Sequence, residues 1–228
     1  MKKQTIKKAF WDTLPVMTGY LFLGVGFGII LQQNGYGPLW ALAMSLFIYA
    51  GSMQYVGIGL LTGGASLLTA ALTTLMVNAR HLFYGLSMIE PYKGAGRRKP
   101  YLIFALTDET YSLVSRKLPE DVERISYCFF VSAFDQCYWV LGSILGSLAG
   151  NLPVDFTGID FALTALFVTI FVEQWLSSKN HLPALVGVIC AAVCLVLFGA
   201  DNFLIPTMIL IAAILVMLQK VKKEAQDA

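Results

Sequence analysis

Charged residues are scarce in this 228-residue sequence: Asp, Glu, Lys and Arg together make up 13% of it, whereas 57% is hydrophobic. A soluble domain carries about 25% charged residues, because water covers most of its surface. The mean hydropathy of +0.69 therefore excludes a secreted or cytosolic globular enzyme. It also excludes a disordered chain, which needs low hydrophobicity and high charge. With a net charge of +2 and no basic block outside the loops, no nucleic-acid partner is expected.

Histidine and cysteine are also few, at two and four residues. The sequence lacks a paired-histidine metal motif, a Gly-rich phosphate loop followed by Lys, and a nucleophile elbow. The four cysteines lie in apolar runs. Cys190 and Cys194 share a helix face, which suits neither a disulfide within that helix nor a full zinc site. We therefore expect no enzymatic activity, no cofactor and no metal, and interpret the cysteines as packing residues.

Long apolar runs are what the sequence does contain. A bilayer core about 30 Å thick requires roughly 20 apolar residues in helical form. Strands of a β-barrel would alternate apolar and polar residues, and these runs do not. We expect an all-α, polytopic integral membrane protein that forms one transporter domain over residues 1–228, with seven or eight transmembrane or re-entrant helices. The candidate spans are 14–32, 39–61, 66–89, 101–114, 126–149, 161–175, 183–199 and 203–218.

Basic residues predict how the chain is oriented. Lys and Arg are concentrated at the amino terminus, in the 116–124 loop and at the carboxyl terminus, which places both termini in the cytoplasm. Eight full spans would leave the basic residues of the 93–99 loop outside. Seven spans, with one of the weaker segments re-entrant, would remove that conflict. Both alternatives are open from the sequence.

Two pairs of matching residues suggest an internal repeat. Gly26 and Gly146 occupy similar places in their spans, as do Gln54 and Gln174, and each pair is about 120 residues apart. Many transporters consist of duplicated halves with the binding site between them. Two matches are also compatible with chance. The halves would be 10–118 and 124–220.

Small and polar residues interrupt the run 39–61 at its centre, in the segment Tyr49-Ala50-Gly51-Ser52-Met53-Gln54-Tyr55. One alternative is an unwound helix, whose free N–H groups favour a carboxylate. Gly51, Ser52 and Gln54 would then be substrate-binding residues. The other alternative is close helix packing through small residues.

A second polar segment, Asn78-Ala79-Arg80-His81, is followed by Tyr84 on the helix face of Arg80. The guanidinium of Arg80 is a permanent cation that suits carboxylates. It could bind substrate together with Tyr84, pair with an acid inside the membrane, or extend to the interface. His81 is a candidate for proton transfer, with a structural role as the alternative.

Three carboxyl groups lie within apolar runs, where an ionisable side chain costs roughly 2.5–3.5 kcal/mol and usually faces a cavity or a partner. Asp108 and Glu109 are adjacent, so at most one of them faces a given side of a helix. They could instead form a polar helix start near the surface. Asp135 lies well inside a strong span and could pair with Arg80. The proton-coupling candidates are Asp108, Glu109, Asp135 and His81.

Four motifs, taken together, resemble the AzlC family of azaleucine-resistance, branched-chain amino acid permeases of bacteria. They are Leu14-Pro15 with Gly24-Val25-Gly26-Phe27-Gly28, then Tyr49-Ala50-Gly51-Ser52-Met53-Gln54, then Asn78-Ala79-Arg80-His81-Leu82-Phe83-Tyr84-Gly85, and Leu106-Thr107-Asp108-Glu109. After Asp108 the resemblance continues in Trp139-Val140-Leu141-Gly142. Asp135 lies outside these motifs.

The resemblance implies export of valine, leucine, isoleucine or close analogues across the bacterial cytoplasmic membrane. It also implies a small hydrophobic AzlD-type subunit as partner. In such a secondary transporter, the broken second helix would meet the substrate carboxylate, Arg80 would assist there or hold an acid, and Asp108 would receive the ammonium group or a proton. The rival hypothesis is a non-transporting membrane scaffold or channel subunit of a larger complex.

Overall fold

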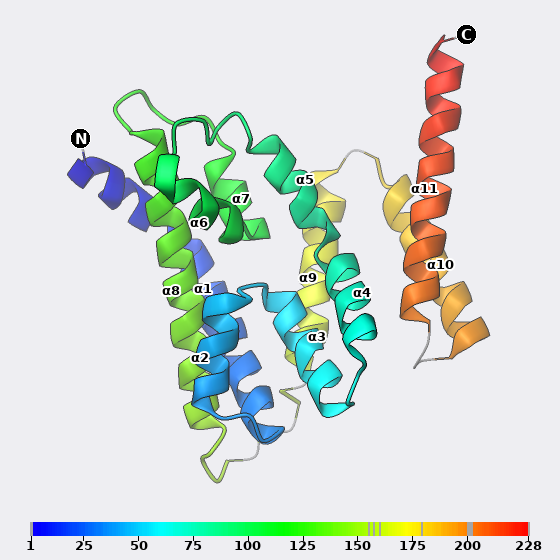
Figure 1. Cartoon of the computed structure of the whole chain (residues 1–228), viewed down its shortest axis with the longest axis horizontal. Coiled ribbons are helices and arrows are strands. Elements are labelled where there is room, and N and C mark those ends of the chain that lie inside the picture. Colours follow the sequence, from blue (N-terminus) through cyan, green and yellow to red (C-terminus); the bar gives the residue numbers. More distant parts are fainter. Residues whose placement is uncertain are drawn as a thin grey trace. The chain divides into compact units, whose positions relative to one another are not determined.

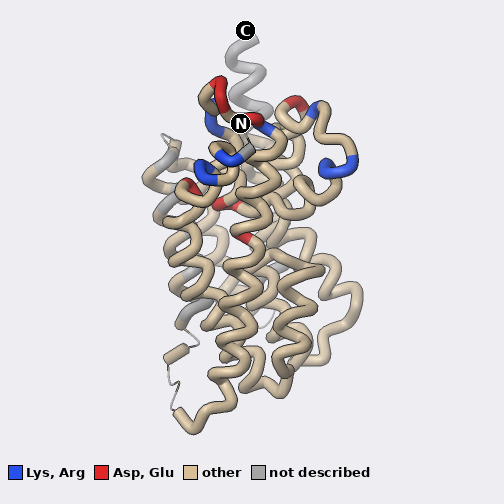
Figure 2. The backbone as a smooth tube through the Cα atoms, turned by 90° about the vertical axis from the view of Figure 1, so that its left-hand side faces the viewer, with Lys and Arg blue, Asp and Glu red and all other residues tan. Residues whose placement is uncertain are grey.

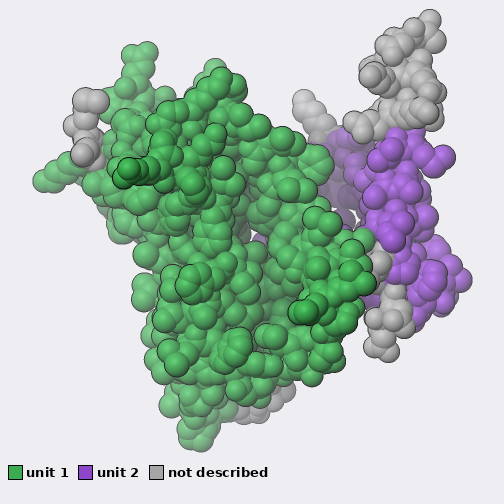
Figure 3. All heavy atoms as spheres, in the orientation of Figure 1, with its two compact units in different colours: residues 1–166 green, residues 167–228 purple. Residues whose placement is uncertain are grey.

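The computed structural model describes residues 2–154, 156, 158–159, 161–178, 180–199 and 203–227, and every regular element in these ranges is helical, which confirms the all-α class. The chain divides into two compact units, Met1–Leu166 and Phe167–Ala228 (Figure 3). The elements, labelled in Figure 1 where there is room, are α1 (Lys2–Gln33), α2 (Pro38–Phe47), α3 (Gly51–Thr62), α4 (Leu67–Val77), α5 (Ala79–Ser87), η1 (Gly96–Arg98), α6 (Lys99–Phe104), α7 (Asp108–Val114), α8 (Arg124–Ala149), α9 (Phe161–Ser177), α10 (Leu182–Phe198) and α11 (Leu204–Asp227).

The surface of the chain is apolar and much of its interior is polar. Leu67 is 90% exposed and Val196 is 85% exposed, as are many other large hydrophobic side chains to lesser degrees. Water would penalise such a surface, whereas lipid tails accept it. The side chains that are completely buried include several polar ones, namely Thr5, Thr13, Ser45, Gln54, Thr110, Ser132, Asp135, Ser143 and Ser147. This distribution is the one that a lipid environment favours.

Two helices, Lys3–Gln33 and Arg124–Ala149, are long and apolar enough to cross a bilayer by length and composition. They run parallel. Near their starts the Tyr127 hydroxyl donates to Asp12 at 2.7 Å, and near their ends Ser147 donates to Gln32 at 3.0 Å. Together α1 and α8 form the central helix pair of the first unit, and α2, α3, α6 and α7 pack against it.

Glycine brings α1 and α8 into backbone contact. A Cβ atom at Gly28 would overlap the carbonyl oxygen of Ser143, and one at Gly146 would overlap the carbonyl oxygen of Val25. A Cβ at Gly24 would stand 3.0 Å from the Ser143 nitrogen. Small residues permit this close approach of helices in membranes.

Residues 39–61 form a helical hairpin and not the single span that their hydropathy predicts. α2 begins at Pro38, which fits the first turn of a helix because it has no N–H to satisfy. The chain turns at Tyr49, whose φ of +42° is rare for a residue with a side chain. α3 then returns beside α2: Gln54 donates to Ser45 at 3.2 Å, and Gly57 faces Met44. Figure 1 shows the connection between the two helices partway along α1 and α8.

Residues 101–114 are a second hairpin, because both ends of this segment contact the start of α8. Arg98, just before α6, donates to Ser126 at 3.3 Å, and Arg124 donates to the carbonyl of Val114 at 3.0 Å, where α7 ends. With six and seven residues, α6 and α7 are each only about 10 Å long. Neither one crosses a bilayer, so the prediction of a full span here is wrong.

The second hairpin begins and ends at the same end of the first unit, so the 93–99 and 116–124 loops lie together. With residues 39–61, two segments fold back, and not the single re-entrant segment of the predicted alternative. The connection that holds Arg98 lies at the same end of the first unit as the start of α8, and Tyr127 ties that end to α1 through Asp12. Figure 2 shows Lys and Arg toward one end of the chain. The 93–99 loop therefore lies with the basic amino-terminal turn of α1 and not opposite it.

The remaining predicted spans are also helical. Residues 66–89 form α4 and α5, which meet at Asn78. The segments 161–175, 183–199 and 203–218 correspond to α9, α10 and α11, and α10 packs on α11 within the second unit. The division after Leu166 differs from the predicted halves 10–118 and 124–220, and the repeat stays a prediction. The side chain of Gln174 lies outside the described residues.

Candidate functional site

Three helix interruptions meet at one cluster of polar side chains. Ser52 lies in the first turn of α3, Arg80 in the first turn of α5, and Asp108 begins α7. Arg80 Nη2 donates to Ser52 Oγ at 3.0 Å and lies 2.9 Å from Asp108 Oδ2. Each residue directly follows a break in its helix, so the breaks bring these side chains together. We call Ser52, Arg80 and Asp108 the break cluster.

Local sequence explains one of the three interruptions, the one before α7. Before Asp108, Thr107 is extended, with φ −87° and ψ 176°, and its hydroxyl accepts a bond from the N–H of Thr110, so it caps α7. Before Ser52, the capping position of α3 is Ala50, which has no side-chain acceptor. The first N–H groups of α3 are thus left without a side-chain cap beside Arg80. Such a helix start favours negative charge.

The ion pair of the break cluster leaves bonding capacity unused. Its side chains are 29% exposed for Arg80 and 24% for Asp108. Asp108 Oδ1 and Arg80 Nε are buried and have no hydrogen-bond partner. A buried polar atom without a partner is costly in a folded protein. The ion pair therefore retains one acceptor atom on its anion and one donor atom on its cation without a hydrogen-bond partner.

Other predicted substrate residues lie elsewhere in the first unit. Gln54 is completely buried, accepts a bond from Trp139 Nε1 at 2.9 Å and donates to Ser45, so its amide is engaged within the fold. A Cβ at Gly51 would stand 2.9 Å from the Trp139 ring. The helix is thus interrupted in this segment and a small residue permits close packing there, while the substrate role of these residues stays a prediction.

On α5, His81 directly follows Arg80, and Tyr84 lies one turn beyond Arg80. The ring of Tyr84 is stacked on Tyr111 of α7, with centroids 4.5 Å apart and an interplanar angle of 11°. The His81 ring stands edge-on to Tyr84, and its Nδ1 lies 3.2 Å from the Asn78 carbonyl in the preceding turn. Tyr84 joins α5 to α7 next to the break cluster, whereas the contacts of His81 are local.

The two other carboxyl candidates accept hydrogen bonds from hydroxyl groups of α1 and α7. Glu109 Oε2 accepts a bond from the Tyr20 hydroxyl of α1 at 2.7 Å. Asp135 is completely buried and accepts a bond from Thr110 at 2.8 Å. Arg80 is thus paired with Asp108, and the alternative of an Arg80–Asp135 pair is not observed. Sequence reasoning missed Tyr20 and Thr110, because a lone Tyr or Thr in an apolar run carries no pattern.

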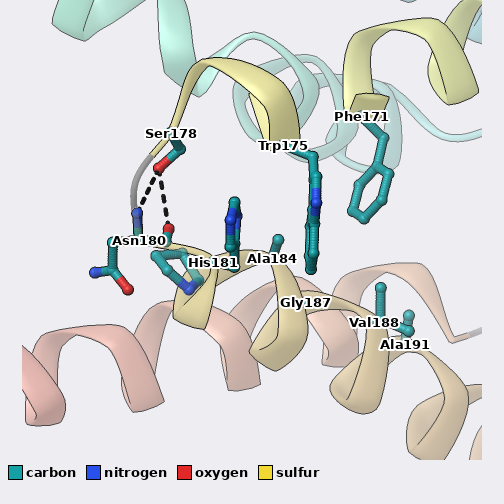
Figure 4. Close-up of a pocket in the computed structure, with 10 residues that line it drawn as sticks. Phe171, Trp175, Ser178, Asn180, His181, Ala184, Gly187, Val188 and Ala191 are labelled. Carbon is teal, nitrogen blue, oxygen red and sulfur yellow. Dashed lines mark hydrogen bonds between the residues drawn. The ribbon is translucent and has the colours of Figure 1, made fainter. Parts of the chain in front are cut away.

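A separate cavity lies in the second unit, between α9 and α10 (Figure 4). Its volume is about 600 Å³. One wall is the indole of Trp175 stacked on the His181 ring, with centroids 4.1 Å apart. None of the residues that line it is Asp, Glu, Lys or Arg, so it offers no charged group to a zwitterion. They are Phe171, Trp175, Ser178, Asn180, His181, Pro183, Ala184, Gly187, Val188 and Ala191.

Comparison with known proteins identifies the family. Residues 15–152 match the AzlC protein family. The chain is 40% identical to the branched-chain amino acid transport protein AzlC of Bacillus subtilis, over 96% of this chain and 87% of that protein. It is 42% identical to an uncharacterized membrane protein of Helicobacter pylori, over 95% and 96%.

A more distant relative is the inner membrane protein YgaZ of Escherichia coli, 30% identical over 87% of this chain and 82% of that protein. No solved structure matches the chain. The relatives are membrane proteins, in agreement with the apolar surface described above. The family match covers more than half of the chain, and the Bacillus subtilis relative aligns along nearly all of it. The chain is therefore a membrane protein that belongs to the AzlC family.

Proposed function

We propose that this protein is a secondary transporter that exports valine, leucine, isoleucine or close analogues, and that the break cluster binds the substrate. The observation that carries this proposal is the Arg80–Asp108 ion pair, in which Arg80 Nε and Asp108 Oδ1 have no hydrogen-bond partner. An amino acid carries a carboxylate and an ammonium group on one carbon. The guanidinium and the uncapped start of α3, at Ser52, suit the carboxylate, and Asp108 suits the ammonium.

The side chain of the substrate requires an apolar wall, which the stacked rings of Tyr84 and Tyr111 supply next to Arg80 and Asp108. An apolar wall distinguishes one methylene by only about 1–3 kcal/mol. Overlapping use of valine, leucine and isoleucine is therefore expected. The transport name of the Bacillus relative, at 40% identity, supports this substrate class.

Orientation and direction of transport follow from the basic end of the first unit and from the family resemblance. With both termini and the 93–99 loop in the cytoplasm, the positive-inside rule is satisfied. Export from the cytoplasm to the outside is proposed on the resemblance. Coupling to protons is proposed through Asp108, Glu109, Asp135 and His81. Of these, Asp108 forms the ion pair with Arg80, and Glu109 and Asp135 are hydrogen-bonded to Tyr20 and Thr110.

A direct test uses the purified chain in liposomes loaded with leucine. Saturable exchange of labelled leucine, stimulated by unlabelled leucine on the opposite side, is expected of a carrier. Valine and isoleucine should compete, and lysine and glutamate should not. Absence of exchange for all three branched-chain amino acids would contradict the proposal. Overexpression in cells should lower the internal pools of the same amino acids.

The small AzlD-type partner is proposed on the family resemblance alone. Co-expression of the two chains with a tag on one should recover both in a fixed ratio, and leucine exchange should rise when both are present. If the pair forms but no flux is seen with or without the second chain, the rival hypothesis of a non-transporting scaffold is correct.

A further inference from the structure

A continuous line of oxygen atoms joins the carboxyl groups of Glu109 and Asp135. From Glu109 Oε2 the line runs 2.7 Å to the Tyr20 hydroxyl, and 2.6 Å further to the Thr107 hydroxyl. Thr107 Oγ1 lies 3.0 Å from Thr110 Oγ1. Thr110 Oγ1 lies 2.8 Å from Asp135 Oδ2. Every step is within the range of an O–H···O hydrogen bond. We call these three hydroxyls the hydroxyl relay.

A count of hydrogens shows how many protons this line holds. It has four oxygen–oxygen contacts, but the three hydroxyls supply only three hydrogens. If Tyr20 donates to Glu109 while Thr107 and Thr110 donate toward Asp135, the 2.6 Å contact between Tyr20 and Thr107 contains no hydrogen. Two oxygens at that separation attract only when a hydrogen lies between them. One additional proton, on either carboxyl group, fills all four contacts.

The surroundings also favour a single shared proton. Asp135 is completely buried and its Oδ1 has no partner, whereas Glu109 is partly exposed. The ionisable groups around Asp135 are the hydroxyls of Tyr20, Tyr49 and Tyr101 and the carboxyl of Glu109. Glu109 also lies near Tyr84, which is close to Arg80 and Asp108. An ionised Asp135 would be completely buried with a second carboxyl, Glu109, as its charged neighbour, which makes its charged form costly.

We infer that Glu109 and Asp135 share one proton, which the hydroxyl relay carries between the partly exposed Glu109 and the buried Asp135. The inference deepens the proposed function, on which its use in transport rests: the break cluster would bind the amino acid and the relay would carry the coupled proton. Tyr20, Thr107 and Thr110 are then positioning and relay residues that do not touch substrate.

The transfer balances atom by atom. A proton held on Glu109 passes to the Tyr20 oxygen as Tyr20 gives its own hydrogen to Thr107. Thr107 gives its hydrogen to Thr110, and Thr110 gives its hydrogen to Asp135. The net change is one proton lost by Glu109 and gained by Asp135. Each hydroxyl still carries one hydrogen, now directed toward Glu109, and the reverse transfer restores the first arrangement.

Removal of single hydroxyls tests the relay in transport. In liposomes, Thr110→Val and Tyr20→Phe should retain leucine exchange, because exchange requires no net proton movement. The rate of uptake driven by a pH gradient should fall by roughly tenfold or more in both variants. Thr110→Ser should restore that uptake. Thr13→Val is the matched control, because Thr13 is also completely buried and its hydroxyl bonds Tyr138 outside the relay.

The outcomes separate the relay from the proposed function. Gradient-driven uptake at the wild-type rate in Thr110→Val and Tyr20→Phe would overturn the relay, and so would a parallel loss of exchange and gradient-driven uptake. Exchange without any gradient response in the unmodified protein would also overturn it, while leaving the amino acid carrier intact. If the unmodified protein does not exchange leucine, the proposed function fails, and infrared spectroscopy decides the relay.

Infrared difference spectra against pH detect a protonated carboxyl group directly, without substrate. We expect one such carboxyl band that Asp135→Asn removes, and whose titration shifts in Glu109→Gln and in Thr110→Val but not in Thr13→Val. A band that titrates identically in Glu109→Gln, Thr110→Val and the unmodified protein would show that no proton is shared, and would overturn the inference.

Discussion

Asp108 and Glu109 are neighbours in the chain yet face different helices. Asp108 Oδ2 lies 2.9 Å from Arg80 Nη2 of α5, whereas Glu109 Oε2 accepts a bond from Tyr20 of α1 at 2.7 Å. Successive residues point about 100° apart around a helix. The first turn of α7 thus directs one carboxyl into the break cluster and the other into the hydroxyl relay, so binding and proton transfer can be tested with separate substitutions.

Neutralising either member of the central ion pair should abolish most transport. A hydrogen bond to a charged group is worth about 1.5–3 kcal/mol, so Arg80→Gln or Asp108→Asn should lower leucine exchange by about tenfold or more. The Arg80→Gln/Asp108→Asn double variant should be as inactive as either single one, but more stable to heat, because no unpaired charge is left.

The exposed pair Glu90–Lys93, 2.7 Å apart with side chains 74% and 70% exposed, is the matched control. Such surface pairs contribute about 0–1 kcal/mol. Glu90→Gln and Lys93→Gln should therefore leave both exchange and melting temperature unchanged. Wild-type exchange in both Arg80→Gln and Asp108→Asn would contradict the assignment of the break cluster as the substrate site.

Gly28→Ala should destabilise the protein, because its Cβ would overlap the backbone of Ser143 on α8. Overpacking of this kind costs about 1–3 kcal/mol. Gly19→Ala, also in α1, has no heavy atom within 4 Å of the added carbon and should be neutral or slightly stabilising. Melting in detergent, followed by circular dichroism, compares the two. Equal melting temperatures would mean that α1 and α8 are not in backbone contact.

Gln54→Leu should lower stability and not substrate affinity. The substitution removes the acceptor of Trp139 Nε1 and leaves that buried N–H without a partner, at a cost of about 1–3 kcal/mol. Gln33→Leu, at an exposed position near the end of α1, is the control. Melting temperature and the concentration of leucine at half-maximal exchange should be measured together. A weaker affinity at unchanged melting temperature would instead assign Gln54 to the substrate.

Glu123 should stabilise the start of α8 in a pH-dependent way. Its carboxylate accepts bonds from the N–H groups of Ile125 and Ser126. The hydrogen bond with the Ser126 side chain, followed by these N–H groups and the charge of Arg98, lowers the pKa of Glu123. A lowered carboxyl pKa means that the stabilisation is complete above the ordinary value of about 4.3 and is lost as pH falls through the folded-state pKa.

The Glu123→Gln variant should therefore melt at a lower temperature than the unmodified protein at neutral pH. The difference between them should shrink as the pH falls below about 4. Glu120→Gln, at an exposed position in the same loop, serves as the control. A difference that stays constant between neutral and acidic pH would show that the Glu123 charge does not contribute.

Several features of the site follow from the sequence alone. Small and polar residues such as Gly51 and Ser52 in a long apolar run predict a weak helix, and the structure interrupts the helix at that point. The cost of placing Arg80 and Asp108 among apolar residues predicts that each has a partner, and each is the other's partner. These inferences succeed because helix propensity and transfer energy are local properties of a residue and its neighbours.

The direction of the chain after each interruption is not local. Hydropathy gives the same score to a segment that crosses the membrane and to one that folds back. It therefore does not reveal that residues 39–61 and 101–114 form hairpins. The choice of Asp108 over Asp135 as partner of Arg80, and the line from Tyr20 to Thr110, depend on which helices touch. The sequence by itself determined an all-helical membrane protein with costly polar residues inside. Only tertiary packing, through the glycine contact of α1 with α8, decided which of those residues meet.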